Sequence, residues 1–261
     1  MTIFTDIVYV LFFLCGVILL ELRMPHKNSE KKTCEDCINS NCLVKKNFTV
    51  DLLNNWESQK IVNHYKKGDS IFSKDDSIIG LNIVMTGAVE LFLNGYDNKM
   101  EIVRFAGNGD IFGHISIENE NYPSNSIAKV DTVVCFFRNS TLLEMHQSNP
   151  KFAFELISFF SRNHNKTVKR LIQNLRMNLR EKVAEALITI YNQFGLDENK
   201  ELIDCINRED IASLANTNAE QVSRQLSEFE KEKIIEKRSR RIAILDIQKL
   251  KKITHYYYTE F

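Results

Sequence analysis

The sequence predicts an α+β protein in which an antiparallel β unit is followed by a long amphipathic helix and then by a small helical domain. Three observations support this order. Short alternating runs fill residues 62–137, a helical pattern of sevens follows Pro150, and two short amphipathic helices precede a basic hairpin near the C-terminus. The chain has 261 residues, 44% of them hydrophobic, which is enough for two domains with separate cores. Its 34 basic and 34 acidic residues cancel, so any charged surface must be local.

The chain opens with an apolar segment, residues 1–23, in which residues 7–20 (IVYVLFFLCGVILL) carry no charge. This run is short for a membrane span, which needs about 20 apolar residues. It also lacks the basic start and small-residue cleavage site of a secretory signal. Two interpretations stay open: a marginal anchor whose basic flank places the rest in the cytoplasm, or upstream sequence from a misplaced start. We favour the second, with Met24 as the initiator, because the pattern after Met24 is complete without this segment.

Residues 24–47 form a polar, Cys-rich arm. Three of its cysteines follow a C-x2-C-x4-C spacing, and a fourth lies in the last run of the β unit. In a reducing compartment such a group favours metal over disulfides, and thiolates suit zinc or an iron–sulfur cluster. The spacing leaves an iron–sulfur cluster, another metal and no metal all open. The candidate ligands are Cys34, Cys37, Cys42 and Cys135. Cys15 and Cys205, the latter in a predicted strand at 202–206, are expected to be packing residues.

Residues 48–148 are expected to form the antiparallel β unit. Alternating runs at 70–72, 81–84, 88–93, 100–105 and 132–137 are separated by turn residues. Gly68, Gly87 and Gly109 mark three of these turns.

A long helix is predicted next, with helical sequence from Lys151 to Phe194 and a dimerisation segment at 149–176. Residues recur at alternating spacings of four and three, which is typical of a coiled-coil seam. The seam comprises Ala153, Ile157, Phe160, His164, Thr167, Leu171 and Asn174. Two interpretations remain: this face pairs with a second copy, or it packs on its own β unit. Its polar second half makes the pairing weak enough for a distant event to shift.

The C-terminal part, residues 177–261, is predicted to contain a helix-turn-helix. Asn207 caps a first helix with Asp210 at its third position, and Asn216 ends that helix in a left-handed turn. A capping box from Thr217 to Glu220 is expected to start the second helix, whose apolar face points inward. The exposed face then carries Glu220, Gln221, Ser223 and Arg224.

A basic hairpin is predicted after the second helix. Residues 237–252 hold seven Lys or Arg against the single acid Asp246, which predicts a surface that contacts DNA phosphates. The candidate contacts in this wing are Arg238, Arg240 and Arg241.

The run Glu220-Gln-Val-Ser-Arg224 inside such a winged helix-turn-helix resembles the Crp/Fnr family of bacterial transcription regulators. By that resemblance Arg224 would donate to a guanine, Glu220 would accept from a cytosine, and Ser223 would touch a base or methyl group. Glu220 also serves as the expected capping partner of its helix, so its free and bound contacts would differ. The resemblance further implies double-stranded DNA, a second copy of the chain and RNA polymerase as partners, action in the cytoplasm and no small-molecule substrate.

The β unit resembles the cyclic-nucleotide-binding β-roll of this family, but it departs from a nucleotide-binding version. His114 stands where a ribose-binding Glu is expected, and the phosphate segment at 123–128, which includes Asn125, contains no Arg. A cyclic phosphate would lose its main charge-assisted contact. We therefore expect no cyclic nucleotide to bind.

The cysteine positions resemble Fnr-type oxygen sensors, which have three cysteines just before the roll and a fourth on a late strand. The resemblance implies a [4Fe-4S] cluster held by Cys34, Cys37, Cys42 and Cys135. This chain has four residues between the second and third cysteines where five are expected, which puts the cluster type in question.

Enzyme activity is not expected. The sequence contains no convincing Ser/His/Asp set, P-loop or paired carboxylates, and His64, His114, His146 and His164 are scattered. The competing hypothesis is a metal-binding or redox sensor, tethered to a membrane or not, whose C-terminal helices are an interaction module. The effect of Arg224 on DNA affinity separates these two classes.

Overall fold

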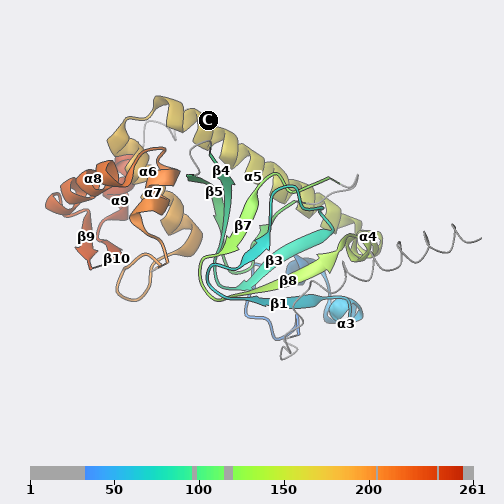
Figure 1. The fold of residues 1–261 in the computed structure, drawn as a ribbon. Helices are drawn as coiled ribbons and strands as arrows, with labels where there is room; N and C mark the ends of the chain where they lie inside the picture. Colours follow the sequence, from blue (N-terminus) through green and yellow to red (C-terminus); the bar gives the residue numbers. More distant parts are fainter. Residues whose placement is uncertain (1–32, 96–98, 115–119, 204, 240, 255–261) are drawn as a thin grey trace, which may run out of the picture.

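The structure is a computed structural model that describes residues 33–95, 99–114, 120–203, 205–239 and 241–254. A β-roll and a smaller helical domain lie at opposite ends of the long helix α5 (Pro150–Arg176), as Figure 1 shows. The predicted apolar segment 1–23, with Cys15, lies outside the described residues. Within the ranges described, no helix is long and apolar enough to cross a membrane.

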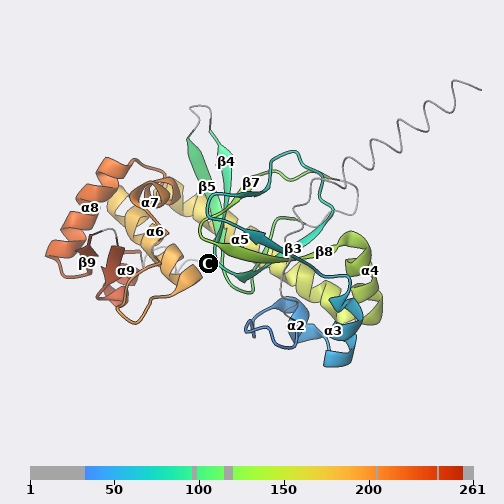
Figure 2. The same cartoon turned by 60° about the horizontal axis from the view of Figure 1, so that its bottom comes forward.

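The arm enters the roll through α2 (Leu43–Asn47) and α3 (Val50–Glu57). Between them Phe48 packs its ring edge-on against Trp56 and Phe152, with centroid distances of 4.8 and 5.0 Å. Because Phe152 is in the first turn of α5, this aromatic contact fixes the arm against the base of the long helix. Figure 2 shows α2 and α3 beside the start of α5.

The roll consists of two antiparallel sheets, with strand orders β1-β8-β3-β6 and β2-β7-β4-β5 among the described residues. The strands are β1 (Ile61–Tyr65), β2 (Ser70–Phe72), β3 (Gly80–Thr86), β4 (Val89–Asn94), β5 (Met100–Ala106), β6 (Ile111–Phe112), β7 (Asn125–Ala128) and β8 (Thr132–Arg138). Between the sheets Phe72 stacks on Tyr122 at 3.8 Å. The predicted α+β class with an antiparallel roll is confirmed.

Gly87 shows why a glycine is needed at one predicted turn. Its φ is +112°, and a Cβ there would lie 2.4 Å from the Thr132 hydroxyl oxygen. Any side chain would therefore be strained and would also push β3 away from β8.

The helical stretch expected from Lys151 to Phe194 is divided into α5 and α6 (Leu179–Phe194). The division occurs because Asn178 caps α6 in a capping box with Glu181. The helix α4 (Asn139–Ser148) joins β8 to α5.

The C-terminal domain adds α7 (Arg208–Leu214), α8 (Ala219–Lys231), β9 (Ile235–Arg238), β10 (Arg241–Ile244) and α9 (Ile247–Thr254). The helix-turn-helix and its hairpin wing are confirmed, including the reciprocal Asn207–Asp210 cap and the positive φ of Asn216. The capping box from Thr217 is wrong by one residue. Asn218 caps α8 instead, because its side chain accepts from the Gln221 amide at 2.9 Å.

The predicted strand at 202–206 is also wrong. Glu201 forms an isolated bridge to Ala243 of β10, and the Leu202 amide donates to the Ile242 carbonyl at 2.9 Å. The pairing goes no further among the described residues, and the Ile206 amide donates to the Ile203 carbonyl at 3.3 Å. Cys205 is buried in this core, which agrees with a packing role.

Candidate functional site

Helix α8 presents a polar face because its apolar face is fully used in packing. Val222, Leu226 and Phe229 are buried against the rest of the domain. On the opposite face Glu220 and Arg224 form an ion pair, one helical turn apart, with side chains that are 74% and 71% exposed. Such an exposed pair is weak, so both groups are available to a ligand.

The other two predicted reading residues differ in exposure. Gln221 is exposed, whereas Ser223 is half-buried and its hydroxyl donates to the Ala219 carbonyl at 2.8 Å. The Ser223 oxygen can still accept a hydrogen bond or touch a methyl group. The face therefore combines a donor-rich guanidinium with acceptors, which suits the edges of base pairs in the major groove.

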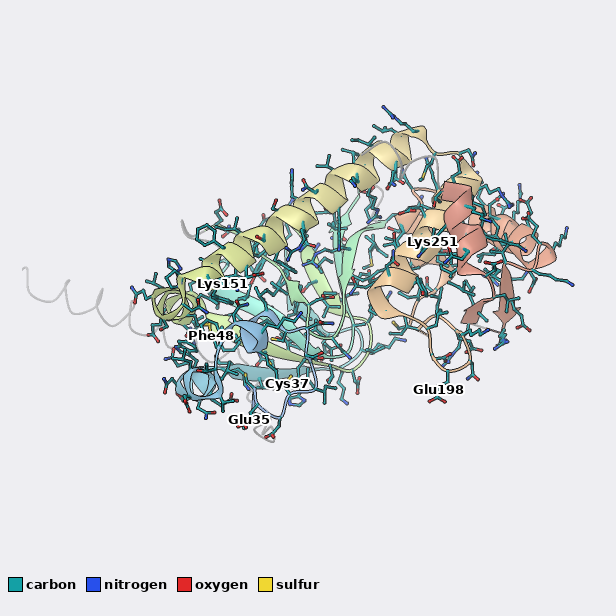
Figure 3. All side chains as sticks on the ribbon, turned by 180° about the vertical axis from the view of Figure 1, so that it is seen from behind. Glu35, Cys37, Phe48, Lys151, Glu198 and Lys251 are labelled. Carbon is teal, nitrogen blue, oxygen red and sulfur yellow. The ribbon has the colours of Figure 1, made fainter. Side chains whose placement is uncertain are left out.

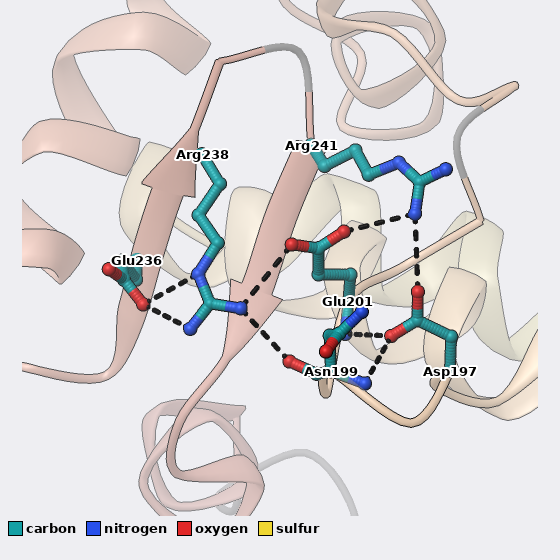
Figure 4. Close-up of polar contacts among 6 residues, drawn as sticks. All are labelled: Asp197, Asn199, Glu201, Glu236, Arg238 and Arg241. Carbon is teal, nitrogen blue, oxygen red and sulfur yellow. Dashed lines mark hydrogen bonds and ion pairs between the residues drawn. The ribbon is translucent and has the colours of Figure 1, made fainter.

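The wing arginines are held by carboxylates, as Figure 4 shows. Arg238 bonds Glu236 at 2.6 and 2.8 Å and Glu201 at 3.3 Å. Arg241 bonds Glu201 at 3.0 Å and Asp197 at 3.2 Å. The sequence alone did not predict Asp197 and Glu201 as partners, because they lie about 40 residues upstream. The third predicted wing contact, Arg240, lies outside the described residues.

A buried cluster of ion pairs joins the C-terminal helical domain to the β-roll. The Lys129 ammonium contacts Glu90 of β4 at 2.7 Å and Asp210 of α7 at 2.8 Å. Next to it the Ser213 hydroxyl accepts from the Ile102 amide at 2.7 Å. The contacts join α7 to the β4–β5 hairpin, and nothing in the local sequence pattern predicts them.

The Arg170 guanidinium strengthens the same junction from α5. It donates to the carbonyls of Val103 at 2.8 Å and Leu214 at 3.3 Å. Arg170 thus links α5 to both β5 and the end of α7.

The exposed seam of α5 is displaced from the predicted one. Phe160 and Ala153 are half-buried, and Phe160 packs on the core of the roll, so they leave the outer face. The α5 stripe instead comprises Phe154, Ile157, Ser161, His164, Val168, Leu171 and Leu175, all of them exposed. It shares Ile157, His164 and Leu171 with the predicted seam and keeps the alternating spacing of three and four. The helix therefore packs on its own roll with one face and exposes a second, partly apolar one.

The four candidate cysteine ligands line one small pocket at the far end of the roll. Cys135 lies in β8 opposite Val62 of β1. The arm supplies Cys34, Cys37 and Cys42, and Figure 3 shows the labelled Cys37 near Phe48 and remote from Lys251 of α9.

Three hydrogen bonds order the arm at this pocket. The Asn39 amide donates to the Met85 carbonyl of β3 at 2.6 Å. The Lys45 ammonium donates to the carbonyls of Glu35 at 2.9 Å and Cys37 at 2.6 Å. The Asn39 bond joins the loop that carries the cysteines to the sheet that carries Cys135, and the Lys45 bonds join that loop to α2.

Three thiols of this pocket have a raised pKa, which disfavours their thiolate form. Burial is the main cause: it raises the pKa of Cys34 to about 11 and that of Cys135 to about 12, and it also raises the pKa of Cys42. A bound metal would offset this desolvation, since metals displace thiol protons.

The donor set fits a group bound by four thiolates, the chemistry shared by zinc and iron–sulfur sites. In the described ranges, however, no three His, Cys, Asp or Glu side chains are already arranged for metal binding. The pocket volume is about 20 Å³, which is space for a single ion.

His114 and Asn125 lie in the part of the β-roll where we predict that no cyclic nucleotide binds. The Asn125 side chain accepts from the Lys74 amide at 2.9 Å, so it is occupied within the roll. Burial and the neighbouring Arg104 lower the pKa of His114, which favours its neutral form. Arg104 itself donates to the Ile111 carbonyl at 2.8 Å.

Two domain families match this chain. The cyclic nucleotide-binding domain matches residues 62–149, and the Crp-like helix-turn-helix domain matches residues 181–253. These ranges contain the strands of the β-roll from Val62 onward and the helix-turn-helix with α8.

Known regulatory proteins are similar to this chain over most of its length. Electron transport regulator A of Shewanella oneidensis is 23% identical over 222 residues, which covers 83% of this chain and 88% of that protein. The fumarate and nitrate reduction regulatory protein of Vibrio cholerae is 22% identical over 218 residues, with coverages of 82% and 86%. The structure of FixK2 from Bradyrhizobium japonicum matches with a TM-score of 0.67 and 23% identity, over 74% of this chain and 96% of that one. This likeness shows the fold.

Proposed function

Because this chain is a DNA-binding transcription regulator of the Crp/Fnr family, we propose that it binds a twofold-symmetric DNA site as a homodimer under the control of an oxygen-labile [4Fe-4S] cluster. No cyclic nucleotide is needed for this control. The observation that carries the proposal is the meeting of Cys34, Cys37, Cys42 and Cys135 at one pocket, although Cys135 is 93 residues from Cys42 in the chain.

Base reading is assigned to the polar face of α8. Arg224 would donate to a guanine, Glu220 would accept from a cytosine, and Ser223 would contact a base or methyl group, with Gln221 beside them. Arg224 and Glu220 form a weak, exposed ion pair in the free protein. This supports the assignment, because replacing that pair with base contacts costs little free energy. Two such helices in a dimer would read half-sites about one DNA turn apart, roughly 34 Å.

Phosphate contacts are assigned to the wing, through Arg238, Arg240 and Arg241. The carboxylates on Arg238 and Arg241 mean that a phosphate must share or replace an existing partner. Binding through these two residues would therefore contribute less than contact by an unpaired arginine.

Dimerisation is assigned to the α5 stripe. Its exposed apolar residues, such as Leu171 and Leu175 at 62% and 80% exposure, would be covered by the same stripe of a second copy. The polar Ser161 and His164 interrupt the stripe and keep the pairing weak.

Control of the dimer would pass from the cysteine pocket to α5. When bound, the cluster would cross-link the arm to β8 through thiolate ligands. Cys135 is four residues from the start of α4, and Asn149, the N-cap of α5, bonds the Asn47 carbonyl of the arm at 2.7 Å. The arm thus contacts the start of the dimer helix directly, and its loss from the pocket would release that contact.

RNA polymerase and the cytoplasm complete the proposal, as the partner and compartment that a bacterial transcription regulator requires.

Protein purified without oxygen tests the cofactor assignment. We expect visible absorption that bleaches in air, with iron and sulfide near four of each per chain. A second candidate, control by a single zinc ion, is favoured by the small pocket volume. Zinc at one per chain without sulfide would establish that alternative and overturn the cluster.

A further inference from the structure

Lys60 places a buried positive charge at the cysteine pocket. Its side chain is 2% exposed, although it lies at the short connection between α3 and β1. It lines the pocket together with the four cysteines, and its ammonium donates to the Cys34 sulfur at 3.5 Å. Lysine is rarely buried to this degree unless its charge is paired.

Glu57 is the partner of that charge. Its carboxylate forms an ion pair with the Lys60 ammonium and accepts from the Cys34 amide at 3.0 Å. The pair therefore hydrogen-bonds to Cys34 at two points, at the sulfur through Lys60 and at the backbone amide through Glu57.

Charges beside a thiolate-bound cluster affect its reduction potential. Four thiolates give the bound group a net negative charge, and its reduction potential depends on nearby charges and on hydrogen bonds to the sulfurs. A positive charge favours the more negative, reduced form, whereas a carboxylate opposes it. At an effective dielectric constant of about 20, a unit charge about 10 Å away changes such an equilibrium roughly tenfold.

We propose that Lys60 and Glu57 are an opposed charge pair that sets the reduction potential of the group bound by the cysteines, with Lys60 raising it and Glu57 lowering it. Both act as positioning residues through Cys34 and through their charge. This inference rests on the proposed cluster.

The experiment compares Lys60→Met with Glu57→Gln in full-length protein purified without oxygen. Both variants break the same ion pair, so structural damage should displace the potential in the same direction in both. The proposal instead requires opposite displacements: lower for Lys60→Met and higher for Glu57→Gln. We expect about tenfold in the reduction equilibrium for each, or 59 mV for a one-electron couple.

An exposed pair supplies the matched control. Lys66 and Asp131 form an ion pair with side chains that are 77% and 63% exposed. Lys66→Met and Asp131→Asn should leave the potential of the bound group unchanged, because water screens their charges.

The outcomes separate this inference from the proposed function. Parent protein without iron and sulfide overturns both. A loaded parent with unchanged potentials, or with displacements of the same sign, overturns the role of the pair alone. Should Lys60→Met assemble no cluster, Lys60→Arg decides. Restored iron content supports a need for charge, and an empty Lys60→Arg protein refutes it.

Discussion

Replacing Arg224 with alanine removes the guanidinium from the exposed face of α8 with little effect on the fold. Arg224 forms an ion pair with Glu220, and the two side chains are 71% and 74% exposed. An exposed pair of this spacing stabilises a helix by about 0.3–0.5 kcal/mol. We therefore expect Arg224→Ala to lower the free energy of unfolding by no more than that amount. A bidentate contact to a guanine discriminates by about 1–3 kcal/mol, so affinity for the selected site should fall about 5- to 150-fold.

The assay is fluorescence anisotropy at a fixed salt concentration, on a duplex selected from a random library and on an unrelated duplex of equal length. Lys231→Ala, at the other end of α8, serves as the control because it removes an exposed charge from the same helix. Arg224→Ala should weaken binding to the selected duplex more than to the unrelated one. Equal losses on both would refute base reading by Arg224 and leave only a contribution to general electrostatic attraction.

Three further predictions concern the roll, the dimer and the domain junction. Calorimetry with micromolar cyclic AMP should give no saturable heat, because His114 and Asn125 replace the required carboxylate and guanidinium; a saturable signal would overturn this expectation. Leu171→Glu should raise the dimer dissociation constant at least tenfold in analytical ultracentrifugation, and an unchanged constant would exclude the α5 stripe as the interface. Lys129→Met should lower the free energy of unfolding in urea by about 3–5 kcal/mol, because it leaves two buried carboxylates without a cation. A loss below about 1 kcal/mol, as for an exposed pair, would contradict that account.

Features set by neighbouring residues could be predicted from the sequence. The Asn207–Asp210 cap and the left-handed Asn216 both depend on contacts within a few residues. The capping error at Thr217 has the same origin. Asn218 is by type a better capping residue than Thr217, and it is the one from which α8 starts.

Features set by distant residues could not be predicted. Glu201, which pairs with Arg238 and Arg241, and Asp197, which pairs with Arg241, come from the loop before α7, so a local count of basic residues overstated the charge that the wing offers. The seam of α5 was displaced because periodicity gives the spacing of a face, while the roll decides which face is covered. Lys60 is not part of a recognisable sequence motif. Its position beside the four cysteines depends on the packing of the arm against the roll.

The central claim is that ligation at the four cysteines controls DNA binding. Its most direct test is the DNA affinity of anaerobic parent, air-exposed parent and Cys135→Ser on one selected duplex. Cys205→Ser is the matched control, because Cys135 and Cys205 are each 8% exposed but only Cys135 lines the pocket. We predict tight binding by anaerobic parent and Cys205→Ser, and at least tenfold weaker binding by air-exposed parent and Cys135→Ser. Equal affinity of Cys135→Ser and parent, with and without oxygen, would contradict control through the cysteine site.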